Sequence, residues 1–270
     1  MSKKAKLRAK PPYLRSISVK ETWTDFSAYP YSLPLFRNSD FSLRFDRPVT
    51  IIVGENGVGK STLLEGIAVL AGFDDAGGGN GYRPVDHSTA METPGGILSK
   101  CLVGGWLPKI SAGWFFKAET FFSVARYLDQ AAREAYAVGP DFLSYSHGEG
   151  FLRFFSERCR RRGIFILDEP ESALSPRRQI ELMRILREAE RAGEAQFIIA
   201  THSPMIMAYP GARLLRMTGD GLYETDFRET DHFSLVKAFV SDPESFVADI
   251  FSDTAEDSQM DLYSQDHSLY

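Results

Sequence analysis

A short glycine-rich segment carries the side chains with the most evident chemistry in this chain. Residues 54–62 read Gly-Glu-Asn-Gly-Val-Gly-Lys-Ser-Thr and directly follow the apolar run 49–53. Glycines let backbone N–H groups turn inward around an anion without a Cβ clash. A lysine adds a point charge for phosphate, and the hydroxyl that follows it is a ligand for Mg²⁺. The segment therefore predicts a phosphate-binding loop for a nucleoside triphosphate with magnesium.

Within this loop, Lys60 is expected to contact the β- and γ-phosphates and Ser61 to ligate the metal. Segment 62–70 is predicted to be helical, and a helix N-terminus favours an anion. A glycine-rich turn that merely joins a strand to a helix is the structural alternative. The residues expected to hold the nucleotide are Glu55, Asn56, Gly57, Val58, Gly59, Lys60, Ser61 and Thr62.

An acidic pair, Asp168 and Glu169, closes a second apolar run at 164–168. In phosphate-loop enzymes, this position holds Mg²⁺ and places a carboxylate near the attacking water. Asp168 is therefore expected to bind the metal and Glu169 to polarise water. The alternative is an acidic pair that only ends a strand and caps the next turn.

A third apolar run, 196–201, is followed by His202, which could reach the γ-phosphate from the same sheet edge. A histidine satisfied by local backbone is the alternative. Another candidate precedes a predicted helix at 148–162, where the Ser146 hydroxyl and the free N–H of Gly148 could meet an anion. Ser146 with Glu149 also fits a simple capping box, and both interpretations can hold together.

Apolar runs alternate with helical patterns along the chain, which predicts a mostly parallel sheet with covered faces. Segment 72–113 is glycine-rich and is predicted to be an irregular insertion. In the helix 176–192, Ser175 is the expected N-cap, and the apolar side chains Ile180, Met183, Ile185 and Leu186 are expected on one face. Predicted strands are 14–20, 41–45, 49–53, 114–117, 164–168, 196–201 and 213–217. Predicted helices are 62–70, 119–137, 148–162 with Gly163 as C-cap, and 176–192 with Gly193 as C-cap.

The 270-residue chain has a net charge of −5, which gives no global attraction to nucleic acid. Its first fifteen residues nevertheless carry six Lys/Arg and no acid, and residues 241–270 carry eight Asp/Glu and no Lys or Arg. Both ends are read as solvated tails, and the basic one could also contact nucleic acid or an acidic partner. No run is apolar enough to cross a bilayer, and the two cysteines lack metal-type spacing. We expect a cytoplasmic protein without membrane insertion or structural zinc.

Together these motifs resemble the ABC ATPase superfamily. Their order matches its phosphate loop, signature (146–149), Walker B strand (164–169), D-loop (172–175) and switch histidine. Within it, the chain resembles stand-alone bacterial predicted ATPases of AAA or ABC type. It is also similar to RecF and SMC heads and to overcoming-lysogenization-type defence ATPases. The resemblance implies an α/β P-loop NTPase fold, with an N-terminal antiparallel subdomain and a small helical lobe.

The resemblance also implies a domain plan and an assembly. The plan is a basic arm at 1–12, an ATPase domain at 13–240 with its helical or insertion lobe at about 72–160, and an acidic tail at 241–270. The assembly is an ATP-induced head-to-tail homodimer in which Mg²⁺-ATP lies between one phosphate loop and the partner's signature. Ser146 and Gly148 would then contact the γ-phosphate in trans.

Two departures from the family pattern weaken a transporter function. Transporter subunits carry a coupling glutamine that is absent between Lys60 and Gln130, where Glu119 takes the nearest comparable place. The signature has His147 and Glu149 where Gly and Gln are usual. An aromatic residue is expected to stack on the adenine, and the candidates are Trp23, Tyr29, Tyr31 and Phe36.

Three classes of function follow from these patterns. The first is a cytosolic ATPase that dimerises on ATP and drives or senses a protein partner. The second is the nucleotide-binding subunit of a membrane transporter. The third is a non-hydrolysing ATP switch, which the presence of Glu169 disfavours. A DNA-repair or phage-defence ATPase acting on nucleic acid fits the resemblance, with the basic arm as its local support.

Overall fold

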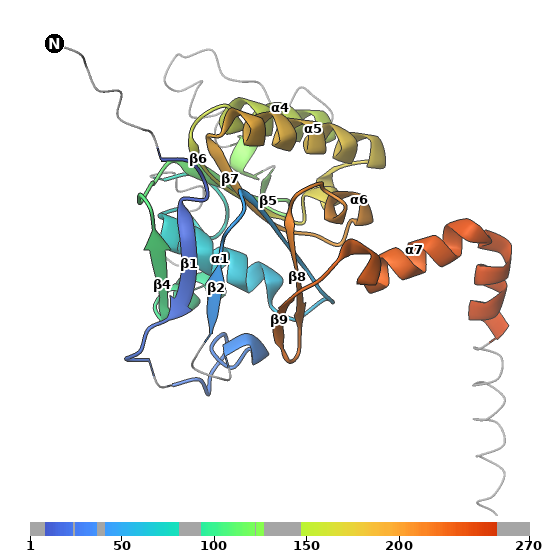
Figure 1. Ribbon diagram of the computed structural model, residues 1–270, viewed down its shortest axis with the longest axis horizontal. Coiled ribbons are helices and arrows are strands. Elements are labelled where there is room, and N and C mark those ends of the chain that lie inside the picture. The colour runs from blue at the N-terminus through green and yellow to red at the C-terminus, as the bar shows by residue number, and fades with distance from the viewer. Residues whose placement is uncertain are drawn as a thin grey trace, which may run out of the picture. The chain divides into compact units, whose positions relative to one another are not determined.

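The computed structural model describes residues 9–23, 25–36, 41–80, 93–121, 123–126 and 147–252. Contacts divide the chain into two compact units, Met1–Thr225 and Asp226–Tyr270. The larger unit contains both sheets and the helices around them (Figure 1). The division into an arm, an ATPase domain and a tail at residues 12 and 240 stays a prediction.

Among the described residues, six strands form the central sheet of the larger unit, in the order β5-β6-β7-β3-β8-β9. Neighbours from β5 to β8 are parallel, and β9 returns antiparallel to β8. Every residue of β3, β6 and β7 is buried, as expected for strands covered on both faces. The predicted mostly parallel sheet is confirmed. The strands are β3 (Val49–Val53), β5 (Gly113–Lys117), β6 (Gly163–Asp168), β7 (Ala195–Ala200), β8 (Arg213–Thr218) and β9 (Gly221–Glu224).

A second, antiparallel sheet has the order β2-β1-β4, with β1 at Leu14–Val19, β2 at Ser42–Arg44 and β4 at Leu102–Trp106. It confirms the predicted N-terminal antiparallel subdomain. The prediction of an irregular segment at 72–113 is wrong where β4 and the helix α2 (Pro94–Ser99) lie. The glycines of β4 serve close approach here, because a Cβ on Gly105 would lie 2.5 Å from Ser16 Oγ.

Helices cover both faces of the central sheet (Figure 1). On one face, α1 (Lys60–Ala71) and α2 share a core with the antiparallel sheet. On the other lie α4 (His147–Cys159) and α5 (Pro176–Ala192). Alternation along β5 sends Phe115 into the first core and Phe116 toward α4. The Phe116 ring lies 6.0, 5.7 and 4.9 Å from those of Phe151, Phe154 and Phe155.

Two helix predictions need correction. Gly163 is the first residue of β6 rather than a C-cap, because α4 ends at Cys159. In α5 the buried residues are Gln179, Leu182, Leu186 and Ala189, whereas Ile180 is 41% exposed. The bounds of α5 are as predicted, with Gly193 left-handed at φ 68°, although the Ser175 side chain makes no capping hydrogen bond. The helix predicted at 119–137 is helical at 121 and 123–126, and its remainder lies outside the described residues.

The smaller unit contains a 3₁₀ turn, η5 (Phe227–Glu229), followed by α7 (Asp231–Ser241) and a helical stretch at 243–252. Asp226 and Glu229 form a capping box, and the Thr230 hydroxyl accepts from Phe233 N at the start of α7. No residue of α7 is buried. Across all described residues, no helix is both long and apolar enough to span a bilayer.

Gln196 on β7 ties the antiparallel sheet to the central one. Its Oε1 accepts from the N–H groups of Tyr13 and Leu14 at 2.7 and 2.9 Å, and its Nε2 donates to the Leu14 carbonyl at 2.9 Å. The side chain is fully buried. A buried amide that satisfies three backbone groups fixes where β1 begins beside the central sheet.

Replacing Gln196 by Leu should therefore destabilise the protein by about 3 kcal/mol or more, because each buried backbone group left unpaired costs about 1–3 kcal/mol. Urea unfolding measures the change. Thr50→Val is the matched control, since Thr50 Oγ1 is equally buried and has no hydrogen bond among the described residues. Equal unfolding midpoints for the two variants would show that Gln196 does not hold the sheets together.

Candidate functional site

The phosphate loop connects β3 to α1 along a path that requires glycine. Gly54 has φ 154°, and a Cβ there would lie 2.2 Å from the Met217 carbonyl oxygen. Gly59 has φ 103° directly before α1, and a Cβ on it would lie 3.0 Å from Leu33. The loop thus lies tightly against β8 and against the segment before η1 (Pro34–Phe36). Glu55, Asn56 and Gly57 are exposed on its outer side.

Lys60 begins α1 with its ammonium folded onto the loop. Its Nζ donates to the carbonyls of Gly54 and Glu55 at 2.8 and 2.9 Å, and the residue is 4% exposed. Burial lowers the pKa of Lys60, while the negative charges of Glu169 and Asp168 act in the opposite direction. The described geometry therefore places a buried cation inside the loop, close to two carboxylates.

Ser61 and Asp168 form the pair expected to hold magnesium. Ser61 Oγ donates to Asp168 Oδ1 at 3.1 Å, joining the start of α1 to the end of β6. Asp168 is 4% exposed, and burial raises its pKa to about 7, although the Ser61 hydrogen bond and Lys117 favour the charged form. A hydroxyl beside a carboxylate is an all-oxygen donor set that suits Mg²⁺. These two residues fit the metal that the sequence predicts.

Glu169 and His202 meet beyond the ends of β6 and β7. Glu169 Oε1 lies 3.7 Å from His202 Nε2. The Glu169 backbone is left-handed, with φ 47°, and its N–H donates to the Ala200 carbonyl at 3.0 Å. A non-glycine residue in this conformation costs about 1–2 kcal/mol and often marks a functional turn. The turn separates the Glu169 side chain from the strand that carries Asp168.

A further carboxylate, missed by the sequence analysis, holds the histidine segment. Glu171, in η4 (Pro170–Ala173), accepts from Thr201 Oγ1 at 2.8 Å and from His202 N at 2.5 Å. Ser203 N donates to Thr201 Oγ1, and Ser203 Oγ donates to Gln179 Oε1 at 2.6 Å. The backbone that carries His202 is therefore attached to both η4 and α5. The only sequence signal was a third acid two residues after Glu169.

Lys117, at the end of β5, is a second cation near Asp168. It is the register partner of Asp168, and its Nζ lies 2.8 Å from Glu65 Oε1 on α1. Burial opposes the charged form, but the hydrogen bond and charge of Glu65 raise the pKa of Lys117 overall. Glu119, the residue nearest to the coupling-glutamine position, is 81% exposed and lies 3.7 Å from Lys117.

Three of the four residues of the predicted signature, 147–149, lie within the described residues. Ser146 lies outside them. Gly148 lies in the first turn of α4 beside η4, where a Cβ on it would be 3.1 Å from the Ala173 carbonyl oxygen. Glu149 pairs with Arg178 at 3.6 Å. In the described part of the chain, no hydrogen bond or ion pair links Gly148 or Glu149 to the phosphate loop.

The four aromatic candidates for adenine stacking differ in exposure. Phe36 and Tyr31 are core residues, and the Tyr31 hydroxyl donates to the Ile97 carbonyl. Trp23 is partly buried, with its ring 4.5 Å from that of Tyr31. Tyr29 is 56% exposed, and its hydroxyl shares a 2.8 Å hydrogen bond with Thr62 Oγ1 of the phosphate loop. Only Tyr29, of the four, combines an exposed ring with contact to the loop.

Comparisons with known proteins agree with this arrangement. Residues 138–208 match the family described as "AAA domain, putative AbiEii toxin, Type IV TA system", and residues 31–95 match an AAA domain family. The thiamine import ATP-binding protein ThiQ of Histophilus somni is 30% identical over 190 residues, which cover 62% of this chain and 85% of ThiQ. The chain belongs to the ABC-type ATPase superfamily.

Other similar proteins come from the same superfamily. The arabinose import ATP-binding protein AraG of Escherichia coli O157:H7 is 26% identical over 220 residues, covering 71% of this chain and 41% of AraG. The chain thus matches less than half of AraG's length. The SMC head domain from Thermotoga maritima aligns over 79% of this chain and 98% of its own, with 14% identity and a TM-score of 0.42. ABC-type ATPases bind ATP with Mg²⁺, and residues 54–62 of this chain have the sequence that predicts a phosphate-binding loop.

The buried Asp168 carboxylate predicts a stability that depends on pH. Because its pKa is raised from 3.8 to about 7, the folded state holds the proton more tightly, and stability falls as pH rises between these values. Without nucleotide or metal, Asp168→Asn should stabilise the protein by about 2–4 kcal/mol at pH 8 and have little effect near pH 4. Urea unfolding at both pH values, with Asp220→Asn as an exposed control, measures this. A gain independent of pH would contradict the assignment.

The contacts of Glu171 predict a role in placing His202. Glu171→Ala should reduce kcat for ATP hydrolysis by about 10- to 100-fold with little change in ATP affinity, because small displacements of a reacting group cost about that much. Glu171→Gln keeps one hydrogen-bond acceptor, so its kcat should lie between those of the wild type and of Glu171→Ala. Steady-state kinetics and nucleotide titration separate the effects, and Glu188→Ala on the exposed side of α5 is the control. An unchanged kcat in Glu171→Ala would remove this role.

Proposed function

We propose that this chain is an ATPase that cleaves the bond between the β- and γ-phosphates of ATP. One observation carries the proposal: the Ser61 hydroxyl on the Asp168 carboxylate, with Glu169 and His202 3.7 Å apart immediately beyond. Nucleotide binding alone would need the loop but not a carboxylate and a histidine placed past it. The family membership supports the same activity.

Each side chain then has a distinct part in hydrolysis. Lys60 leaves the loop carbonyls for the β- and γ-phosphates, and α1 directs its N-terminal N–H groups toward them. Ser61 and Asp168 hold Mg²⁺, which neutralises charge on the phosphates when bound. Glu169 orients and polarises the attacking water, and His202 contacts the γ-phosphate. The Tyr29 ring is the proposed stacking surface for the adenine.

The active form in this proposal is a head-to-tail dimer formed on ATP. Ser146 and Gly148 of one subunit would contact the γ-phosphate bound to the other, and the D-loop at 172–175 would cross the interface. The contact between Gly148 and Ala173 supports this, because it places the signature helix and the D-loop side by side. Their backbone N–H groups would add to the charge that the loop supplies. Hydrolysis would open the dimer and so act on a cytoplasmic protein partner.

Two other functions draw on narrower observations. The names of ThiQ and AraG refer to thiamine and arabinose import, which favours a transporter subunit. Against a transporter function, the coupling glutamine is absent. Glu119 takes the nearest comparable place, and its side chain is 81% exposed. A role on nucleic acid in repair or phage defence rests on the basic residues near the N-terminus. The site itself is the same in all three.

The decisive experiment measures the solution mass of Glu169→Gln with and without Mg²⁺-ATP by light scattering. Loss of the base should slow turnover by about 100-fold or more, so that ATP persists and a 30.3 kDa monomer becomes a dimer of twice that mass. Lys60→Ala, which removes the phosphate contact, should stay monomeric and fail to bind ATP. Wild-type turnover in Glu169→Gln would refute the hydrolytic assignment, and an unchanged mass would refute the ATP-induced homodimer.

A further inference from the structure

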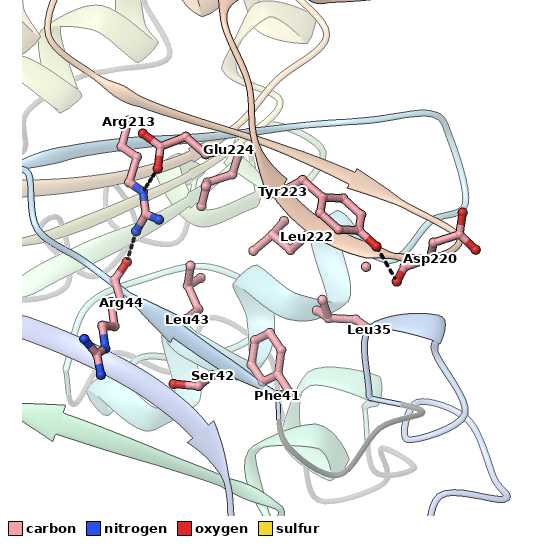
Figure 2. Close-up of a pocket in the computed structure, with 12 residues that line it drawn as sticks. Leu35, Phe41, Ser42, Leu43, Arg44, Arg213, Asp220, Leu222, Tyr223 and Glu224 are labelled. Carbon is pink, nitrogen blue, oxygen red and sulfur yellow. Dashed lines mark hydrogen bonds and ion pairs between the residues drawn. The ribbon is translucent and has the colours of Figure 1, made fainter.

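A groove of about 630 Å³ lies away from the phosphate loop, between β2 and the β8–β9 hairpin (Figure 2). Its floor is apolar and its rim is polar. The floor consists of Leu35, Phe41, Leu43, Leu215 and Leu222, and all but Leu222 are buried. No part of the proposed ATP mechanism uses this groove.

The groove is bordered by two strands that each end a sheet. β2 is the outer strand of the antiparallel sheet, and β9 is the outer strand of the central sheet. Within the described part of the chain, each of them has one side without a neighbouring strand. An outer strand presents unpaired backbone N–H and C=O groups, which can template another strand.

The hydrogen bonds of β2 show which of its backbone groups face outward. Phe45 N donates to the Arg15 carbonyl, and Val19 N donates to the Phe41 carbonyl. Because bonding alternates along an antiparallel pair, the N–H and C=O groups of Ser42 and Arg44 point away from β1. Arg213 confirms this direction, because its Nη1 donates to the Arg44 carbonyl at 2.6 Å (Figure 2).

The same reasoning applies to β9. Thr225 N donates to the Leu214 carbonyl, and Tyr223 is the register partner of Arg216. Alternation therefore turns the backbone groups of Leu222 and Glu224 away from β8. Two rows of outward-facing peptide groups thus border one apolar floor.

The charged side chains on the rim of the groove indicate which charge a ligand should carry. Arg213 is engaged by Glu224 at 3.1 Å and by Asp46 at 3.9 Å. Arg44 is exposed at the β2 side of the rim, and among the described residues no ion pair is recorded for it. An acidic side chain opposite Arg44 on an added strand would form a favourable cross-strand pair.

We propose that this groove binds an extended peptide segment of a partner protein, which adds as a strand to the open edge of β2. Alternate apolar side chains of the peptide would enter the floor, and an acidic one would face Arg44. The outward-facing backbone groups of β2 repeat along the strand, which suits a peptide backbone better than a compact ligand with a few convergent contacts. The site would thus receive the protein partner on which the proposed ATPase acts, although peptide binding itself needs no ATP.

A library of random twelve-residue peptides, displayed on phage and selected on the nucleotide-free protein, tests this proposal. The expected winners alternate apolar residues with at least one acid. As synthetic peptides, they should bind Ser42→Pro at least ten-fold more weakly than wild type, because proline removes the outward N–H while the β1 ladder remains. Ser42→Thr, which keeps the N–H, is the matched control. Arg44→Glu should also weaken binding.

Two further readouts keep the outcome decisive. ATP affinity should be unchanged in all three variants, which shows that each is folded and separates this test from the proposed ATPase. Hydrogen exchange should slow at Ser42 or Arg44 when peptide binds. Failure to select any binding peptide would overturn the proposal. So would peptides that bind Ser42→Pro as well as wild type, or protection confined to another surface.

Discussion

The buried carboxylate of Asp168 is the feature on which the rest of this site depends, because the proposed metal site needs it ionised while burial favours its protonated form. Asp168 lies at the end of β6 and accepts a hydrogen bond from the Ser61 hydroxyl of α1, and its raised pKa expresses the free-energy cost of ionising it there. Lys117, paired with Glu65, reduces that cost without reaching the carboxylate as a hydrogen-bond donor in the described geometry. A bound cation would stabilise the ionised carboxylate further. Folding and ligand binding are therefore linked at this carboxylate.

Three acids within four residues take separate tasks because the backbone changes direction between them. Asp168 ends the strand, Glu169 adopts a left-handed conformation, and Glu171 lies in the 3₁₀ turn that follows. The turn points the second acid toward His202, and the third acid accepts from the Thr201 hydroxyl and from the His202 backbone N–H. A continued strand would have sent the second and third acids, Glu169 and Glu171, to one face and Asp168 to the other. The strained backbone of Glu169 thus lets the three carboxylates reach different partners, which a regular strand would not allow.

Local chemistry explains which features could be predicted from the sequence. The phosphate loop, the acidic strand end and the α5 caps each depend on neighbouring residues, and buried parallel strands show as uninterrupted apolar runs. By contrast, β4 was missed because its glycines meet another strand. The roles of Glu171 and Lys117 were missed because their partners lie 30 or more residues away in sequence. The choice of Tyr29 among four aromatics likewise required exposure and a contact to Thr62.

The groove and the phosphate loop share two supports, which gives peptide binding a physical route to the nucleotide. Leu33 lies against Gly59, and Leu35, two residues on, forms part of the groove floor. On β8, the Met217 carbonyl approaches Gly54, and Leu215 on the same strand face lines the groove. A strand added to β2 that moves either support must also move the loop, because a close-packed contact transmits displacement. The coupling would be reciprocal. If bound peptide changes the affinity for ATP by some factor, bound ATP must change the affinity for the peptide by the same factor.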